Sequence, residues 1–263
     1  MTAGHEPHLE AARLLATSWQ RGQHIGELPA HCRPRTREEG FAVQGLWESL
    51  TGLSVGGWKI AATSEAGQRH IAVDGPLAGP VFASHVHGGG ATVSLAANRM
   101  RVAECEVVFR MGRTLAPRDG GYGRDEVLAA VATIQPGIEV PDSRFERFEL
   151  AGAAQLIADC ACSNEMIIGA AVAPDERVAT LPDLVVQAQV SDGRQPTGSG
   201  RNVLGDPVTA LCWLVAELGR AGRTLQAGQF VTTGACVPPI PVLPGQRVEA
   251  DFGWIGRIEA TFA

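Results

Sequence analysis

The stretch Arg101-Val-Ala-Glu-Cys-Glu-Val-Val-Phe109 predicts a central strand of the fold. Successive side chains of a β-strand point to opposite faces, so Glu104 and Glu106 share one face while the alternate residues form an apolar face. A strand exposed to water tolerates such a pair, because two opposed carboxylates cost only tenths of a kcal/mol to about 1 kcal/mol there. This stretch alone is therefore compatible with an ordinary solvated strand.

A third acid changes that interpretation. Glu139 stands between two β-branched residues and shortly before Pro141. An unpaired carboxylate is energetically costly in such an apolar setting. Three carboxylates without a histidine are typical of a site for a hard cation that leaves positions open for water and substrate oxygens. We therefore expect Glu104, Glu106 and Glu139 to bind Mg2+ or Mn2+.

Lys59 is the single lysine in a chain with 22 lysines and arginines in total. Arginine stays protonated at any accessible pH, whereas lysine can lose its proton when it is desolvated or lies beside other charges. The preceding Gly56 and Gly57 permit close approach of the backbone, and Trp58 shields the amine from water. A composition rich in arginine would also explain a single lysine, but these neighbours favour proton transfer by Lys59.

The hydrophobic pattern divides the chain into two parts. Residues 1–55 carry apolar positions at helical spacing and predict a helical N-terminal part. Residues 56–263 contain short β-rich runs separated by glycine and proline, and they predict a β-rich catalytic domain. The fold class is therefore α+β. We expect strands in the 80s and at residues 92–95, 101–110, 184–190, 230–233 and 247–252, a loop at 85–90, and helices at 124–133 and 206–218.

Composition excludes several classes of protein. The net charge of −6 and the scattered arginines argue against a nucleic-acid partner. The sequence has no run near the ~18 apolar residues that span a membrane and no signal-peptide pattern, so we expect a cytoplasmic location and no membrane partner.

The cysteines and histidines narrow the chemistry further. We expect the six cysteines to be thiols, and Cys160-Ala-Cys162 lacks the second pair or nearby histidine of a zinc site. All seven histidines lie at or before His87, and no G-x-S-x-G motif occurs, which disfavours a nucleophilic triad.

Several motifs carry a resemblance in sequence order. They are GWKIAATS at 57–64, VDGP at 73–76, ECE at 104–106, IEVPDSR at 138–144, IAD at 157–159, TGSG at 197–200 and GDP at 205–207. With them the chain resembles, from about His8 to its end, the 2-keto-4-pentenoate hydratase and 4-oxalocrotonate decarboxylase family of the fumarylacetoacetate hydrolase superfamily.

This resemblance implies a fold, a cofactor and a substrate class. It implies a helical N-terminal part followed by a mixed β-sandwich or β-roll, with Mg2+ held by Glu104, Glu106 and Glu139. Members act on 2-oxo or 2-hydroxy-dienoate acids in aromatic catabolism and form homo-oligomers. A cation that chelates a 2-oxo acid is a Lewis acid and stabilises an enolate, while Lys59 would move a proton between oxygen and carbon.

Departures from the family pattern concern the expected substrate contacts, which are Leu77, Asp159, Cys162, Thr233 and Gly234. Leu77 stands where the hydratases have an acid, which favours decarboxylation. Small or apolar residues replace polar ones after Asp159 and after Gly234, which leaves open a C–C bond hydrolase or a tautomerase. A catalytically inactive partner subunit is the remaining alternative, but it would have no reason to retain mutually repelling acids.

Overall fold

The computed structural model describes residues 5–263. The α-helices are α1 (His5–Gln20), α2 (Arg37–Gln44), α3 (Trp47–Thr51), α4 (Glu65–His70), α5 (Arg124–Leu128), α6 (Gly152–Ala158) and α7 (Pro207–Arg220). The strands are β1 (Val55–Ala61), β2 (Leu77–Phe82), β3 (Val86–Gly88), β4 (Thr92–Val93), β5 (Val102–Met111), β6 (Val131–Val140), β7 (Glu165–Ile168), β8 (Val185–Val190), β9 (Thr197–Ser199), β10 (Phe230–Ala235), β11 (Ile240–Pro241), β12 (Arg247–Asp251) and β13 (Arg257–Phe262).

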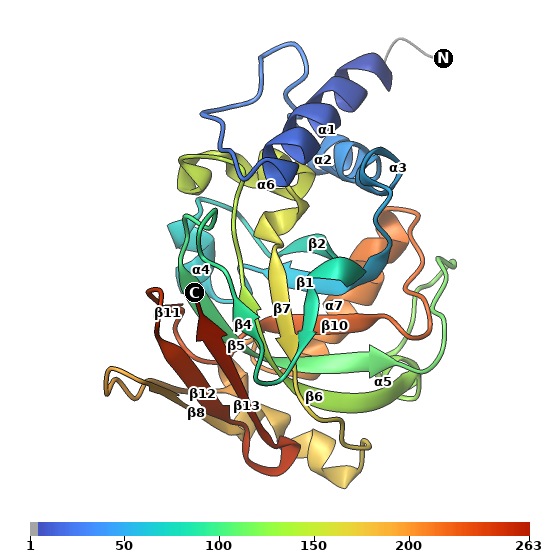
Figure 1. Ribbon diagram of the computed structural model, residues 1–263. Coiled ribbons are helices and arrows are strands. Elements are labelled where there is room, and N and C mark those ends of the chain that lie inside the picture. The colour runs from blue at the N-terminus through green and yellow to red at the C-terminus, as the bar shows by residue number, and fades with distance from the viewer. Residues whose placement is uncertain (1–4) are drawn as a thin grey trace.

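The strands form two mixed sheets. The larger sheet has eight strands in the order β2-β1-β10-β5-β6-β7-β3, and β11 pairs with β5 at its side. The smaller sheet has five strands in the order β4-β13-β12-β8-β9. Figure 1 shows β8, β12 and β13 as a separate layer from the strands of the larger sheet. The central strands β1, β10, β5 and β6 are neighbours, although they come from distant parts of the chain.

The main apolar core contains residues from both sheets. Ala103, Cys105 and Val107 of β5 belong to this core, whereas Val108 belongs to a smaller cluster with Phe230. This alternation confirms the predicted apolar face of β5. Strands β8, β12 and β13 alternate buried and exposed residues, so the smaller sheet turns one face to the core and one to water. Helix α7 adds its own apolar side chains to the same core.

The N-terminal helices form a second core at one end of the molecule. Helices α1, α2 and α3 lie there together with α6 (Figure 1). Ala12 and Leu15 of α1 are fully buried, and they cluster with Trp47 of α3 and Phe82 of β2. The indole Nε1 of Trp47 donates a hydrogen bond to the backbone oxygen of Ala158 at 3.0 Å. These contacts join the N-terminal helices to the larger sheet through α6. The domain boundary that the sequence predicts at residue 55 stays a prediction.

Most predicted elements occur, with two differences. Strands β4, β5, β8, β10 and β12 lie where the sequence predicts them, and α7 begins after Asp206, whose Oδ1 accepts a hydrogen bond from the amide of Val208 at 2.9 Å. The predicted helix at 124–133 is wrong beyond Leu128, because β6 begins at Val131 and its backbone pairs with β5. The predicted loop at 85–90 contains β3, which pairs with β7.

The six cysteines are all free thiols, as predicted. None of the helices between residues 5 and 263 is both long enough and apolar enough to cross a membrane.

Candidate functional site

Three carboxylates converge on the larger sheet. Glu104 of β5 lies directly opposite Glu139 of β6 in the strand register, and Glu106 follows two residues later on the same face of β5. Each of the three offers one oxygen within 4.8 Å of the others. The structure thus brings together the three acids that the sequence singles out. Glu106 and Glu139 are only 1% exposed.

Strand β10 supplies hydrogen bonds to one of these acids. Glu106 Oε2 accepts a hydrogen bond from the hydroxyl of Thr232 and another from the backbone amide of Gly234 at 2.7 Å. The pairing of β10 with β5 is irregular between Thr232 and Ala235, which places the Gly234 amide beside the carboxylate. Gly234 has φ of +107°, and a Cβ there would overlap with Thr63, so this position requires glycine.

Lys59 of β1 joins the three carboxylates, so that β1 is the fourth strand of the site after β5, β6 and β10. Its Nζ lies 3.1 Å from Glu139 Oε1 as an ion pair, and it donates a hydrogen bond to the backbone oxygen of Ala161 at 3.0 Å. Lys59 is 2% exposed. The sheet order β1-β10-β5-β6 therefore brings four distant chain segments into one buried cluster.

Burial and mutual repulsion determine the protonation of this cluster. Burial raises the pKa of Glu139 to about 7, although the charge of Lys59 acts in the opposite direction. Burial also raises the pKa of Glu106 well above its ordinary value, and the charges of Glu139 and Glu104 add to this effect. For Lys59, burial alone would lower the pKa, but the charges of Glu139 and Glu104 outweigh it, so the pKa is raised.

The cluster fits a divalent cation. Glu106 Oε1 and both carboxylate oxygens of Glu139 are buried without a hydrogen-bond partner, and the ion pair of Glu139 with Lys59 lacks hydrogen-bond geometry. Buried carboxylate oxygens normally have partners, because an unpaired one carries its full desolvation penalty. If all three glutamates ionise to bind metal, one ammonium leaves two negative charges, which a divalent cation would balance. Oxygen donors in this arrangement are those that Mg2+ and Mn2+ prefer.

A cavity of about 640 Å³ opens beside the cluster. Lys59, Glu104 and Gly234 line it, and Glu106 and Glu139 lie deeper. Its walls are mostly apolar and include Met100 and Phe148. A cavity of this size accommodates a small organic acid.

A turn of left-handed residues contacts Lys59 in addition to Glu139. Cys160, Ala161 and Cys162 have φ of +53°, +51° and +61°. This region costs residues other than glycine roughly 1–2 kcal/mol each, so the surroundings must hold the turn in place. Gly79 of β2 permits its close approach, because a Cβ at residue 79 would overlap with the backbone oxygen of Cys160. The result is that Ala161 presents its carbonyl oxygen to Lys59 Nζ.

A buried ion pair brackets this turn. Asp159, which precedes the turn, is fully buried and pairs with the guanidinium of Arg144. Its Oδ2 also accepts hydrogen bonds from the Ser143 hydroxyl at 2.7 Å and from the Arg144 amide at 3.0 Å. The same guanidinium donates to the backbone oxygens of Asp159 and of Ser163, which follows the turn. Arg144 therefore fixes both ends of the segment that holds Lys59.

Two of the five expected substrate contacts lie in the cavity. Cys162 and Gly234 line it. Burial raises the pKa of Cys162 to about 12, so its thiol is protonated at neutral pH and is a poor nucleophile.

The other three expected contacts lie away from the cavity wall. Leu77 is 1% exposed and belongs to the main apolar core. Asp159 forms an ion pair with Arg144, and the Thr233 hydroxyl donates a hydrogen bond to the backbone oxygen of Val107 at 2.9 Å. The motifs identify these positions, but they do not show which side chains the backbone turns inward.

The cavity also contains residues that the sequence analysis does not predict. His70 lies at the end of α4, and its ring packs edge to face against Phe148 with the ring centroids 5.9 Å apart. Asn202 also lines the cavity and donates from Nδ2 to the backbone oxygen of Cys236 at 2.7 Å. The position of His70 soon after the GWKIAATS motif is the one sequence signal that could have indicated it.

Comparison with known proteins identifies the family. The family model described as "Fumarylacetoacetate (FAA) hydrolase C-terminal" matches residues 62–263. The chain belongs to this family, which confirms the superfamily predicted from the motifs.

Within the family, the chain is similar to 2-keto-4-pentenoate hydratases. One from Dechloromonas aromatica (strain RCB) is 30% identical in an alignment of 262 positions that covers 96% of each chain. Another from Paraburkholderia xenovorans (strain LB400) is 28% identical and covers 96% of this chain and 94% of its own. Among solved structures, 4-oxalocrotonate decarboxylase from Pseudomonas putida G7, complexed with magnesium and adipate, matches with a TM-score of 0.88 over 100% of both chains at 24% identity, and it shares the fold.

The raised pKa of Glu139 leads to a prediction about stability. In the folded protein its pKa is about 7, against an ordinary value of 4.5. Between these two pH values the folded protein binds more protons than the unfolded chain. The contribution of Glu139 to the free energy of unfolding of the metal-free protein should therefore fall as pH rises from 4.5 to about 7. Thermal unfolding with a chelator across this range measures the effect, and excess Mg2+ should reverse it most at the upper end.

Glu139→Gln is the control for this experiment. The variant cannot ionise at residue 139, so its stability should fall less steeply over the same pH range. An equal slope in the variant and the wild type would show that Glu139 does not determine the pH dependence.

The Arg144 and Asp159 pair leads to a second prediction. Asp159→Asn leaves the guanidinium buried without its counter-ion, and breaking such a pair should lower the free energy of unfolding by about 3–5 kcal/mol. The control is Asp183→Asn, which removes an exposed partner of Arg201 and should change stability by less than about 1 kcal/mol. Urea unfolding measures both, and equal effects would contradict the structural role of Asp159.

Proposed function

We propose that the protein is a divalent-metal-dependent lyase that acts on a 2-oxo or 2-hydroxy-enoate acid. The observation that carries this proposal is the buried cluster of Glu104, Glu106 and Glu139 with Lys59 beside a cavity for a small acid. The three glutamates would hold Mg2+ or Mn2+, and Lys59 would act in proton transfer. Membership of the fumarylacetoacetate hydrolase family and similarity to hydratases support it. A homo-oligomer stays a prediction from the resemblance.

The chain's own residues prepare the site for this chemistry. When bound, the cation supplies a Lewis acid for the oxygens of the substrate. Ala161 and Glu139 hold Lys59 Nζ at 3.0 Å and 3.1 Å, so its position is fixed before the substrate enters. The Gly234 amide and the Thr232 hydroxyl hold Glu106 in the same way. The apolar wall around Met100 and Phe148 would keep bulk water away from the substrate and leave the reaction to a positioned water molecule.

Hydration fits this cavity better than decarboxylation of a diacid. Among the residues from 5 to 263 that line the cavity, Lys59 is the one lysine or arginine. A 2-oxo diacid carries a second carboxylate, which would need a further cation away from the metal. The decarboxylase preference drawn from Leu77 loses its support, because Leu77 lies in the core. His70 is the group on the cavity wall that we propose to orient water.

Lys59→Arg tests the proposed proton transfer. Arginine keeps the positive charge but cannot release its proton, so we expect turnover to fall about 100-fold or more, the usual scale for acid and base catalysis. Steady-state kinetics with Mg2+ in excess give the value, and thermal unfolding shows whether the variant folds. Lys59→Met serves as a second variant of similar volume. Nearly full activity in Lys59→Arg would show that only charge is needed.

The reaction itself can be identified from its products. The Mg2+-loaded protein is incubated with 2-hydroxypenta-2,4-dienoate and, in parallel, with a 2-oxo diacid, and the products are measured by mass. We expect gain of water on the monoacid to be the faster reaction, and His70→Asn to reduce it by about 10-fold or more. Faster release of carbon dioxide from the diacid would contradict the hydratase assignment, and cleavage of a carbon–carbon bond with water would indicate a hydrolase.

A further inference from the structure

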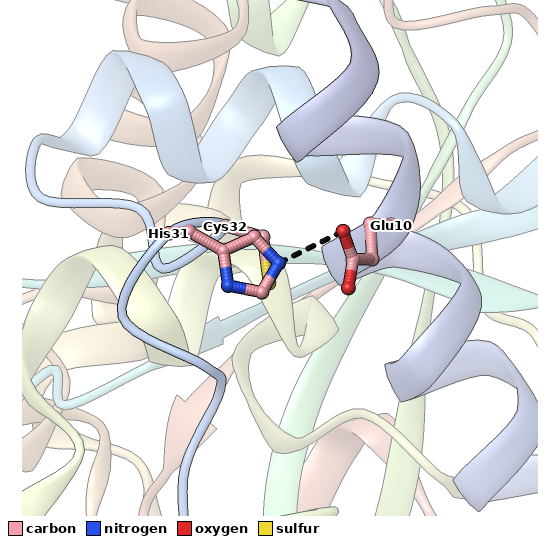
Figure 2. A group of neighbouring side chains, drawn as sticks. All are labelled: Glu10, His31 and Cys32. Carbon is pink, nitrogen blue, oxygen red and sulfur yellow. Dashed lines mark hydrogen bonds and ion pairs between the residues drawn. The ribbon is translucent and has the colours of Figure 1, made fainter.

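A second group of metal-binding side chains lies in the N-terminal helical region. Glu10 is on α1, and His31 and Cys32 are on the loop between α1 and α2 (Figure 2). Each offers one ligand atom, and these atoms lie within 4.8 Å of one another. We propose that Glu10, His31 and Cys32 bind a divalent ion of the zinc type, with a water molecule as the fourth ligand. None of these residues belongs to the catalytic cavity.

The two segments fix the backbone positions from which the three side chains project. The flanking Ala11 and Ala12 of α1 are fully buried, which fixes the position of Glu10. On the loop, Arg33 donates two hydrogen bonds to the backbone oxygen of Leu28, at 2.9 and 2.7 Å. The amide of Cys32 donates to the backbone oxygen of Pro29 at 3.0 Å. Binding would therefore require little ordering of the backbone, which keeps its entropic penalty small.

The exposure of the ligands provides an entry path. The side chains of His31 and Glu10 are 65% and 49% exposed, and His31 Nε2 lies 3.0 Å from Glu10 Oε2. Cys32 is buried beneath them in the apolar cluster of the N-terminal helices. Zinc bonds of about 2.0 Å to nitrogen and oxygen and about 2.3 Å to sulfur would need the ligand atoms to approach by only about 1 Å. Side-chain rotation of the two exposed residues can provide this movement.

The donor atoms select a different ion from the one we propose for the catalytic cluster. Thiolate and imidazole favour Zn2+ and similar ions, whereas Mg2+ prefers oxygen donors only. Binding would replace the proton of the Cys32 thiol by the ion and release that proton to water. The ion would then link α1 to the loop and stabilise the packing of both against the sheet.

Cobalt is the probe for this site, because a thiolate bound to Co2+ gives a charge-transfer absorption that carboxylates do not give. Co2+ is titrated into the full-length protein in the presence of excess Mg2+, which occupies oxygen-only sites. We expect the thiolate band to saturate at one Co2+ per chain and to disappear in Cys32→Ser. The matched control is Cys212→Ser, which changes a partly exposed cysteine elsewhere and should keep the band.

His31→Ala keeps the test decisive if Cys32→Ser fails to fold. His31 is largely exposed, so its removal should leave the fold intact but weaken Co2+ binding about 10-fold or more. Zn2+ should also raise the thermal unfolding midpoint of the wild type and not that of His31→Ala. Absence of the band in the wild type, or a band that Cys32→Ser retains, would overturn the proposal.

Discussion

The structure depends on the close approach of three carboxylates in a place that water hardly reaches. Glu104 and Glu139 face each other across β5 and β6, and Glu106 lies on the same face. Their repulsion and desolvation oppose folding, and burial accordingly raises the pKa values of all three. Such a cluster persists only because four neighbouring strands fix its geometry. A protein with no use for a cation would gain stability by replacing the whole cluster, Lys59 included, with apolar residues.

The compensation for this repulsion comes from parts of the chain that are far apart. Glu106 receives hydrogen bonds from β10, and Glu139 receives the charge of Lys59 from β1. Lys59 in turn depends on a turn of three consecutive left-handed residues, which the pair of Arg144 and Asp159 holds. Backbone strain of this kind is found mainly where function needs a group in a particular position. The strain here places a carbonyl oxygen rather than a catalytic side chain.

Sequence reasoning correctly predicts those parts of the fold and the site that depend on a local pattern of residues. Period-two alternation identifies β5, the apolar setting of Glu139 indicates its burial, and Asp206 with Pro207 marks the start of α7. Sequence reasoning fails where pairing between distant segments determines the secondary structure or the direction of a side chain. The segment after Leu128 becomes a strand because β5 needs a partner, and Leu77 and Asp159 occupy family motif positions yet turn away from the cavity. The left-handed turn contains no glycine, so no residue type reveals it.

Charge balance connects the metal cluster to the choice of substrate. Three ionised glutamates, one protonated lysine and a divalent cation would sum to zero, so the metal-loaded site would be electrically neutral before the substrate binds. A monoanionic substrate then adds one negative charge, which lies within reach of both the cation and Lys59. A dianion would add a second charge at its far end, where the cavity wall is mostly apolar and offers Asn202 and His70 but, among residues 5–263, no second lysine or arginine. Because an uncompensated charge is costly in such surroundings, we expect the proposed site to select its substrate first by the number of carboxylates and then by shape.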